Sequence, residues 1–435
     1  MLQTIGVANI SELFSSIPQE SRLKRNLNLP SPLSELELRN HLRDLSRRNA
    51  HGEEWGMFLG GGSYSHYIPS AVSQLILRGE FLTAYTPYQP EISQGTLQAI
   101  FEYQTMMAEI LGMEIANASQ YDASTATAEA TRLTLNVTDR KKVLVARSLH
   151  PEYRQVLAAY LHNEDAEIIE IPFTADGTLD RTFLKKTVDK DTAGVLAGSP
   201  NFFGVVEDLS DVAQLVHEAG GLFVSVTQEP LALGLYLAPG ETGADIAVAE
   251  GQSFGNTMSY GGPGLGVFAA RREFVRSMPG RLVGETVDTE GQRGFVLTLA
   301  TREQHIRREK ASSNICTNVS LCALAATITL ALWGREGLRE IAQSNFDRSE
   351  TLKEKIFAIQ GFQPAFKGPT FNEFVVKTSV DPEALIQKLL PEHIIPGIPL
   401  KRWYPELENA LLVTVTEMNT DVQIHRLLAA LGGVK

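Results

Sequence analysis

The sequence predicts an α/β protein with a large, mostly parallel sheet and a smaller C-terminal α+β domain. Between residues 142 and 270, short apolar runs alternate with helical segments, which is typical of parallel strands joined by helices. A long apolar helix follows, and strands and helices recur beyond it. The 435 residues, 43% hydrophobic and 21% charged, are enough for two or three globular domains with buried cores.

Residues 1–55 are expected to form a helical arm and not a domain. The run from Ser34 to Glu37 is a capping-box pattern, which marks the start of a helix. Leucines follow it at near-helical spacing, at Leu36, Leu38, Leu42 and Leu45. Prolines interrupt the rest of the segment, so we expect only short helical pieces there.

Residues 56–330 are expected to form the large α/β domain. Its first part is rich in glycine, tyrosine and proline, and it predicts two long loops, Gly60 to Pro69 and Tyr85 to Gly95. A helix over 96–112 and an alanine-rich helix after Asp122 come next. The apolar runs that predict strands are 142–146, 167–173, 193–197, 222–226, 246–249 and 266–270, with helices over 151–161 and 209–219 between them.

Residues 331–435 are expected to form the small domain. The apolar helix over 316–333 links it to the large domain. The β-rich runs 372–377 and 411–416 predict strands, and helices are expected near 334–360, 382–390 and 420–431. This order predicts an α+β layer.

Charge and cysteine content exclude several classes of function. A formal net charge of −12 argues against a nucleic-acid or anionic membrane surface. The longest apolar run, 319–333, is shorter than the roughly 20 residues of a membrane span. Cys316 and Cys322 predict free thiols and a reducing cytoplasm. The N-terminus lacks a signal-peptide pattern, and no Cys/His grouping has metal-ligand spacing.

The order of arm, parallel-sheet domain and small domain resembles fold type I pyridoxal-phosphate (PLP) enzymes. Because a fold does not establish a function, the site must be argued separately. Such an enzyme holds the cofactor phosphate on backbone N–H groups at a helix N-terminus. It also needs a carboxylate for the pyridine nitrogen and a lysine for the Schiff base.

The sequence offers part of a phosphate site but lacks the carboxylate for the pyridine nitrogen. Ser124 and Thr125 open a predicted helix and are candidates for a vestigial phosphate site, although they are equally typical of an N-cap. An acid is expected at the end of the fourth strand, where the residues are Thr227 and Gln228. Glu229 is the nearest acid and is expected to be out of register.

The lysine is also missing. Gln252 stands near the position where the fold predicts it, and no lysine occurs between Lys190 and Lys310. Neither glutamine nor serine supplies an amine for a Schiff base. Lys310 lies among Arg307, Arg308 and Glu309, where an ion-pair or anion-binding role is favoured over a covalent one. No covalent cofactor site is therefore expected in this chain.

Five segments together resemble one known family. They are Gly60 to Pro69, Tyr85 to Gly95, Phe254 to Gly264, Arg276 to Gly284 and Thr301 to Thr317. In this order they are similar to the P-protein of the glycine cleavage system, and specifically to the half that lacks the PLP lysine. The similarity extends over nearly the whole chain.

The resemblance implies a function shared with a second chain. In that family glycine is decarboxylated on PLP, and the aminomethyl group passes to the lipoyl arm of the H-protein. Some members divide the enzyme into two homologous subunits, of which only the second carries the lysine. This chain is then expected to be subunit 1, inactive alone, in a heterodimer or heterotetramer whose PLP is held by subunit 2.

The resemblance also implies candidates for a site shared with the partner. The polar aromatic loop offers Tyr85, Tyr88, Gln89, Glu91 and Gln94, which either line that site or form a surface connection. Farther along, Arg308, Lys310, Asn314 and Thr317 either hold an anionic group of the partner's site or form an interface salt-bridge cluster.

His150 is a further candidate, either beside a cofactor-like cleft or as a capping residue. Two other functions stay open from the sequence. One is an independent PLP-dependent aminotransferase or lyase with an unrecognised lysine. The other is a purely structural pseudoenzyme subunit.

Overall fold

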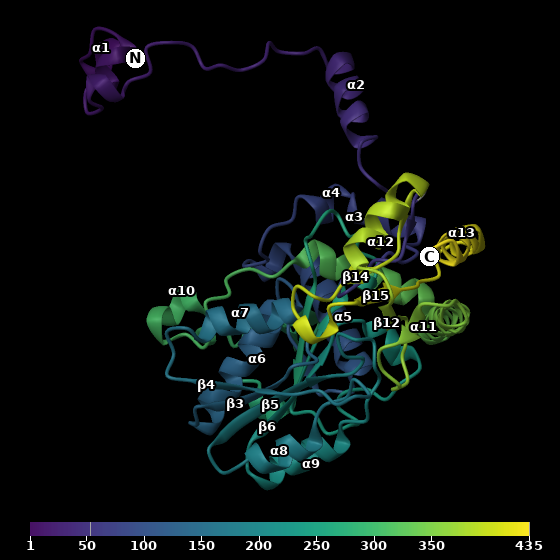
Figure 1. The fold of residues 1–435 in the computed structure, drawn as a ribbon. Coiled ribbons are helices and arrows are strands. Elements are labelled where there is room, and N and C mark those ends of the chain that lie inside the picture. The colour runs from purple at the N-terminus through teal and green to yellow at the C-terminus, as the bar shows by residue number, and fades with distance from the viewer. Residues whose placement is uncertain (53, 435) are drawn as a thin grey trace. The chain divides into compact units, whose positions relative to one another are not determined.

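The computed structural model describes residues 1–52 and 54–434. The chain forms two compact units, Met1–His51 and Gly52–Lys435. Figure 1 traces the elements of both units. The helices are α1 Leu2–Ile5, α2 Glu35–Ser46, α3 Ser70–Ile76, α4 Gly79–Leu82, α5 Gln94–Leu111, α6 Ala123–Thr138, α7 Pro151–Leu161, α8 Arg181–Thr187, α9 Ser210–Glu218, α10 Gln304–Arg307, α11 Ser320–Phe357, α12 Pro382–Leu389 and α13 Asp421–Gly432.

The N-terminal unit is held by local hydrogen bonds. The Oγ of Ser34 accepts from the backbone N–H of Glu37, and the Glu37 carboxylate accepts from the backbone N–H of Ser34 at 2.8 Å. This is the predicted capping box at the start of α2. No residue of α1 or α2 is buried, and the leucines of α2 are exposed. The unit therefore has apolar side chains but no core of its own.

The second unit is built on a seven-stranded sheet in the order β2-β8-β7-β6-β5-β3-β4. The strands β3 to β7 pair in parallel, whereas β8 runs antiparallel to β7, and β2 antiparallel to β8. Every residue of β5, β7 and β8 is buried, as expected of strands covered on both faces. The strands are β2 Ile115–Ala116, β3 Lys142–Ala146, β4 Glu167–Ile171, β5 Thr192–Gly198, β6 Leu222–Thr227, β7 Ile246–Glu250 and β8 Gly266–Ala270.

A separate antiparallel hairpin precedes the basic part of the sequence. It pairs β9, Leu282–Val287, with β10, Arg293–Thr298. Its inner residues Val283 and Phe295 pack with Leu97 and Ile100 of α5 in a small apolar cluster. The hairpin thereby fixes the start of α5, and with it the end of the Tyr85 to Gly95 loop.

The C-terminal part contains a four-stranded antiparallel sheet in the order β11-β12-β15-β14. Its core joins Phe374 and Val413 from the sheet with Leu385 from α12 and Leu427 from α13. A two-residue parallel bridge connects β1 to β13. These strands are β1 Gly56–Met57, β11 Phe362–Pro364, β12 Glu373–Thr378, β13 Ile394–Ile395, β14 Ile398–Pro399 and β15 Ala410–Thr414.

Helix α11 runs between the large sheet and the C-terminal sheet. It is broken at Gly334, whose φ of 58° and ψ of −170° are not helical. Among the described residues it is the one helix long and apolar enough to cross a membrane by length and composition. Its first part buries Ala325, Ala326 and Leu330, so it packs as a core helix of this unit.

The predicted fold class is confirmed: the chain is α/β, with a large, mostly parallel sheet and a smaller C-terminal α+β part. The strands lie at the predicted positions, and the helices predicted over 316–333 and 334–360 meet at the break in α11. The direction of β8 and the β9–β10 hairpin were not predicted. The boundaries at residues 55 and 330 stay predictions.

Candidate functional site

The N-terminus of α6, the candidate phosphate site, is already capped by carboxylates of this chain. The Asp122 Oδ1 accepts from the backbone N–H of Thr125 at 2.8 Å and from the Ser124 hydroxyl at 2.7 Å. The Glu250 Oε2 accepts from the backbone N–H of Ala123 at 3.0 Å. Ser124 and Thr125 therefore serve the cap, and two carboxylates lie where a phosphate would need N–H donors.

Glu250 is held in place by backbone amides at the end of β7. Its Oε1 accepts from Leu265 N at 2.8 Å and from Gln252 N at 3.1 Å, and the residue is 6% exposed. Burial raises the pKa of this carboxyl to about 7, against the effect of the three amide donors. The Glu250 carboxylate thus lies at the start of α6, where three backbone amides bind it.

Gln252, near the position predicted for the lysine, uses its amide to tie down a loop. Its Oε1 accepts from the backbone N–H of Tyr64 at 2.9 Å. Its Nε2 donates to the carbonyls of Tyr64 at 3.0 Å and Asn256 at 2.6 Å. The residue is buried. Both halves of the amide are satisfied, so the side chain is a structural bridge between the loop before α3 and the end of β7.

Gln228, at the end of β6, also bonds within the protein. Its Nε2 donates to the Glu373 carboxylate at 2.9 Å and to the Tyr64 hydroxyl at 3.2 Å. Glu373 accepts in addition from Gly61 N, from the Tyr64 hydroxyl and from the Thr414 hydroxyl, at 2.7 to 2.8 Å. Burial raises the pKa of Glu373. This network joins the large sheet to the C-terminal sheet.

His66 makes a second buried bridge. Its Nε2 lies 2.9 Å from Glu229, and its Nδ1 lies 2.9 Å from Glu417. Burial alone would lower the pKa of His66, but the two carboxylates outweigh it and raise this pKa to about 10. Glu229 is therefore engaged with His66, and its predicted position out of register with the missing acid stays a prediction.

His150 bonds the backbone of the loop before α3 and caps a helix. Its Nε2 donates to the carbonyl of Gly61 at 2.7 Å, and its Nδ1 accepts from Glu152 N at the start of α7. The ring stacks on Tyr153 with centroids 4.4 Å apart. Burial lowers the pKa of His150, which favours the neutral ring. The cap predicted for this residue is present, and its place beside a cofactor-like cleft stays a prediction.

These residues do not fit PLP. We call them the filled cleft: His66, Gln228, Glu229, Glu250, Gln252 and Glu373. A cofactor phosphate would face two carboxylates at the start of α6, and the amides at positions 228 and 252 already bond the loop that contains Tyr64. Displacing them would leave several buried polar groups without partners.

The other predicted residues lie elsewhere, in two of the sequence motifs that contact each other. The tyrosine loop, residues 85–95, contacts the basic segment, residues 301–317, where the rings of Tyr88 and His305 meet edge to face at 6.2 Å. Gln94 ties the loop to β10, because its amide both donates to and accepts from the backbone of Phe295 at 2.8 Å. Tyr85, Gln89 and Glu91 are exposed.

The basic segment offers most of its charged side chains to solvent, although Arg302 and Glu303 are buried. Arg308 and Asn314 line a surface hollow of about 510 Å³, which also contains Arg132 and Tyr160. Lys310 is exposed and Thr317 is half-buried. Arg308 has a φ of 55°, a conformation that costs energy for a residue with a side chain and is often found at functional sites. The structure thus places Arg308 and Asn314 together.

Sequence reasoning missed Arg281. This residue is 3% exposed and bonds the tyrosine loop through Thr86 at 3.2 Å and Tyr88 at 3.1 Å. Its place in the Arg276 to Gly284 motif was a possible signal. Glu250 was missed too, because an acid at a strand end is usually solvent-exposed.

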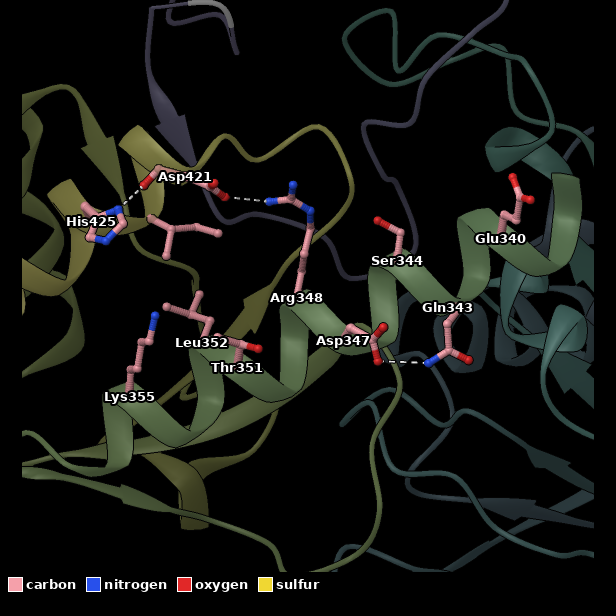
Figure 2. A pocket seen from close by; sticks show the side chains of 11 residues that line it. Glu340, Gln343, Ser344, Asp347, Arg348, Thr351, Leu352, Lys355, Asp421 and His425 are labelled. Carbon is pink, nitrogen blue, oxygen red and sulfur yellow. Dashed lines mark hydrogen bonds and ion pairs between the residues drawn. The ribbon is translucent and has the colours of Figure 1, made fainter.

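A larger hollow, of about 670 Å³, lies between the second part of α11 and α13 (Figure 2). Arg348 and Asp421 form an ion pair across it at 3.1 Å. None of the predicted site residues lines it. Over the residues that the structure describes, no group of three or more potential metal ligands is present.

Comparison with known proteins begins with the fold. The chain superposes on a Burkholderia pseudomallei sphingosine-1-phosphate lyase with a TM-score of 0.69 at 15% identity, covering 96% of this chain and 94% of the other. It superposes on a NifS-like protein from Rickettsia africae with a TM-score of 0.63 at 13% identity, covering 86% and 97%. Together with the sheet topology, these likenesses show that the chain has the fold type I architecture.

The family follows from closer matches. The profile described as "Glycine cleavage system P-protein" matches residues 1–431. A crystal structure of a glycine decarboxylase (P-protein) in inhibitor-bound form has a TM-score of 0.91 at 45% identity, covering 99% of this chain and 96% of the other. The chain belongs to the glycine cleavage system P-protein family.

Two curated relatives are each 50% identical to this chain over its whole length and 97% of theirs. They come from Carboxydothermus hydrogenoformans and Moorella thermoacetica, and both are described as "Probable glycine dehydrogenase (decarboxylating) subunit 1".

Proposed function

We propose that this chain is subunit 1 of a two-subunit glycine dehydrogenase (decarboxylating). With a lysine-bearing subunit 2 it decarboxylates glycine and passes the aminomethyl group to the lipoyl arm of the H-protein. The observation that carries the proposal is full-length similarity to proteins described as subunit 1, at 50% identity. The filled cleft adds a physical reason for a second subunit, because the polar groups of this chain that a cofactor would need already bond one another.

PLP is proposed to be held by subunit 2. Two features of this chain support that assignment. The amide of Gln252 cannot form a Schiff base, and the start of α6 is capped by Asp122 and Glu250 instead of being open to a phosphate. The chain alone is then inactive, and its contribution to the reaction is to shape and stabilise the partner's site.

The contribution of this chain is proposed to come from the tyrosine loop and the basic segment. Both present exposed side chains, among them Tyr85, Tyr88 and Arg308, and they contact each other through Tyr88 and His305. Guanidinium and ammonium groups at Arg308 and Lys310 suit an anion such as a carboxylate or phosphate. Tyr85 and Tyr88 add exposed aromatic area with polar tips, which is typical of contact surfaces.

The assembly is proposed to be a heterodimer or a pair of heterodimers in the cytoplasm. The cytoplasmic assignment is supported by the two cysteines, Cys316 and Cys322, both of which are free thiols. Homologous subunits of an obligate complex are expected to share a large interface.

Glycine-dependent exchange of carbon dioxide, measured with each subunit alone and with both, tests the proposal. We expect exchange only when this chain and the lysine-bearing subunit are combined in the presence of PLP and H-protein. Exchange, or a Schiff-base absorbance, from this chain alone would show an independent PLP enzyme. Full exchange from the partner alone would reduce this chain to a structural subunit.

A further inference from the structure

Arg281 is a buried arginine at the point where three family motifs meet. It follows Gly280, whose φ of 73° and close approach to Asn117 and Gln120 leave no room for a side chain. The backbone there is fixed on both sides. Arg302 donates to the carbonyl of Gly280 at 3.0 Å, and the carbonyl of Arg281 accepts from Ala118 N at 2.9 Å. The Arg281 side chain therefore extends from a backbone segment that is fixed by hydrogen bonds.

The Arg281 guanidinium is directed at the tyrosine loop. One terminal nitrogen donates to the Thr86 hydroxyl at 3.2 Å, and the other donates to the Tyr88 hydroxyl at 3.1 Å. The charged carbon lies 5.4 Å from the centroid of the Tyr88 ring, within range of a cation–π interaction. Tyr88 itself is 53% exposed. The buried arginine therefore holds an exposed tyrosine side chain in place.

The basic segment closes the arrangement from the other side. Glu303 is buried, and its carboxylate lies 3.7 Å from the Arg281 Nε and 3.6 Å from the His305 Nδ1. The His305 ring in turn contacts Tyr88. The four side chains Arg281, Tyr88, His305 and Glu303 thus form a closed set that links the tyrosine loop to the basic segment.

We propose that Arg281 is a positioning residue of the site shared with the lysine-bearing subunit: its buried guanidinium sets the conformation of the tyrosine loop through Tyr88. This rests on the proposed function. A buried guanidinium is costly unless it is paired and hydrogen-bonded, and here its hydrogen bonds to side chains all go to the loop. In this proposal Arg281 acts on the site through the loop that it bonds.

The test compares Arg281→Met, Tyr88→Phe and the double variant in complexes assembled with saturating partner subunit. Tyr88→Phe removes only the hydroxyl that accepts from Arg281. We expect kcat/KM for glycine in the exchange reaction to fall about tenfold in Arg281→Met and about threefold in Tyr88→Phe. The double variant should be no worse than Arg281→Met, since both changes remove one linkage. Arg281→Lys should restore part of the loss.

Arg293→Met is the matched control. Arg293 also lies over an aromatic ring, 5.0 Å from the centroid of Phe295, in the neighbouring hairpin, but it is exposed and pairs with Glu285. This variant should keep the wild-type kcat/KM. If Arg281→Met does not fold, Tyr88→Phe combined with Thr86→Val removes both acceptors of the guanidinium while the buried charge stays, and the same loss of about tenfold is expected.

Three results would overturn the proposal. They are an unchanged kcat/KM in the Arg281 and Tyr88 variants, losses that multiply in the double variant, and losses that are found only when the partner subunit is below saturation. The last result would mean that Arg281 serves assembly only. Failure of the proposed function looks different, because the wild-type pair would then show no exchange at all.

Discussion

The filled cleft and the surface formed by the tyrosine loop and the basic segment differ in how their polar groups are satisfied. In the cleft, Glu250, Gln252 and Glu373 are buried and bond other groups of the same chain. On the surface, Tyr85, Tyr88 and Arg308 are exposed. The place where the fold predicts a cofactor has therefore become a structural core, whereas the groups available to a partner lie outside it.

This contrast predicts that changes in the cleft alter stability and changes on the surface alter catalysis. The largest effect on stability is expected from Glu373→Ala. The variant leaves buried donors at Gly61, Tyr64 and Thr414 without their acceptor, so unfolding in denaturant should show a loss of about 3 kcal/mol. Assembled with saturating partner, the variant should keep its kcat/KM within about twofold. A loss of kcat/KM with unchanged stability would contradict the claim that the filled cleft serves stability and not catalysis.

A second effect depends on pH. The pKa of His66 is about 10 in the folded chain and near its ordinary value of 6.5 when unfolded. Because the folded state binds this proton more tightly, the stabilisation is complete below about pH 6.5 and is lost as pH rises through 10. The stability advantage of the wild type over His66→Gln should therefore shrink by about 2 kcal/mol from neutral pH to pH values above 10. Denaturant unfolding across this range checks it, and an advantage that grows with pH would contradict the charged bridge.

Tyr88→Ala should give the opposite result from Glu373→Ala. Tyr88 is exposed, but its hydroxyl is one of the two side-chain acceptors of the buried Arg281, so stability should fall by about 1 kcal/mol, well below the loss in Glu373→Ala. The exchange rate of the assembled complex should fall about tenfold, equivalent to about 1.4 kcal/mol in the barrier. Tyr67→Ala, a change at another exposed tyrosine outside the tyrosine loop, is the control. Equal losses in both would remove the special role of the tyrosine loop.

The smallest effect is expected from Ser124→Ala. Its hydroxyl bonds only Asp122 in the α6 cap, so the loss of stability should be about 0.5 kcal/mol. Neither the PLP content nor the exchange rate of the complex should change. A drop in PLP content would show that the start of α6 binds the cofactor phosphate after all.

The fold was largely predictable because each buried strand is a short apolar run. The run 142–146 coincides with β3, and 222–226 with β6. The direction of β8 was not predictable, since an apolar run that is buried on both faces has the same pattern in parallel and antiparallel strands. Helix α11 starts at Ser320 and not at residue 316, because the preceding residues bond to the segment around Ser119.

The sequence allowed the missing lysine of the site to be predicted, but it allowed little of the arrangement of the site's side chains to be predicted. A missing lysine can be read from the sequence, whereas the partner of Glu250 at Ala123 is 127 residues away, and that of Arg281 at Tyr88 is 193 residues away. Contacts of this kind depend on the packing of the whole sheet. Tyr88 could be proposed from its loop, but the residue that holds it could not.

The central claim is that the cofactor cannot be held by this chain, even when an amine is supplied. The direct measurement is borohydride reduction of a PLP-loaded complex that carries Gln252→Lys, followed by peptide mass analysis. A pyridoxyl group is expected on the partner's lysine alone, because the carboxylates of Asp122 and Glu250 still cap the start of α6. A pyridoxyl group on residue 252 would contradict the account.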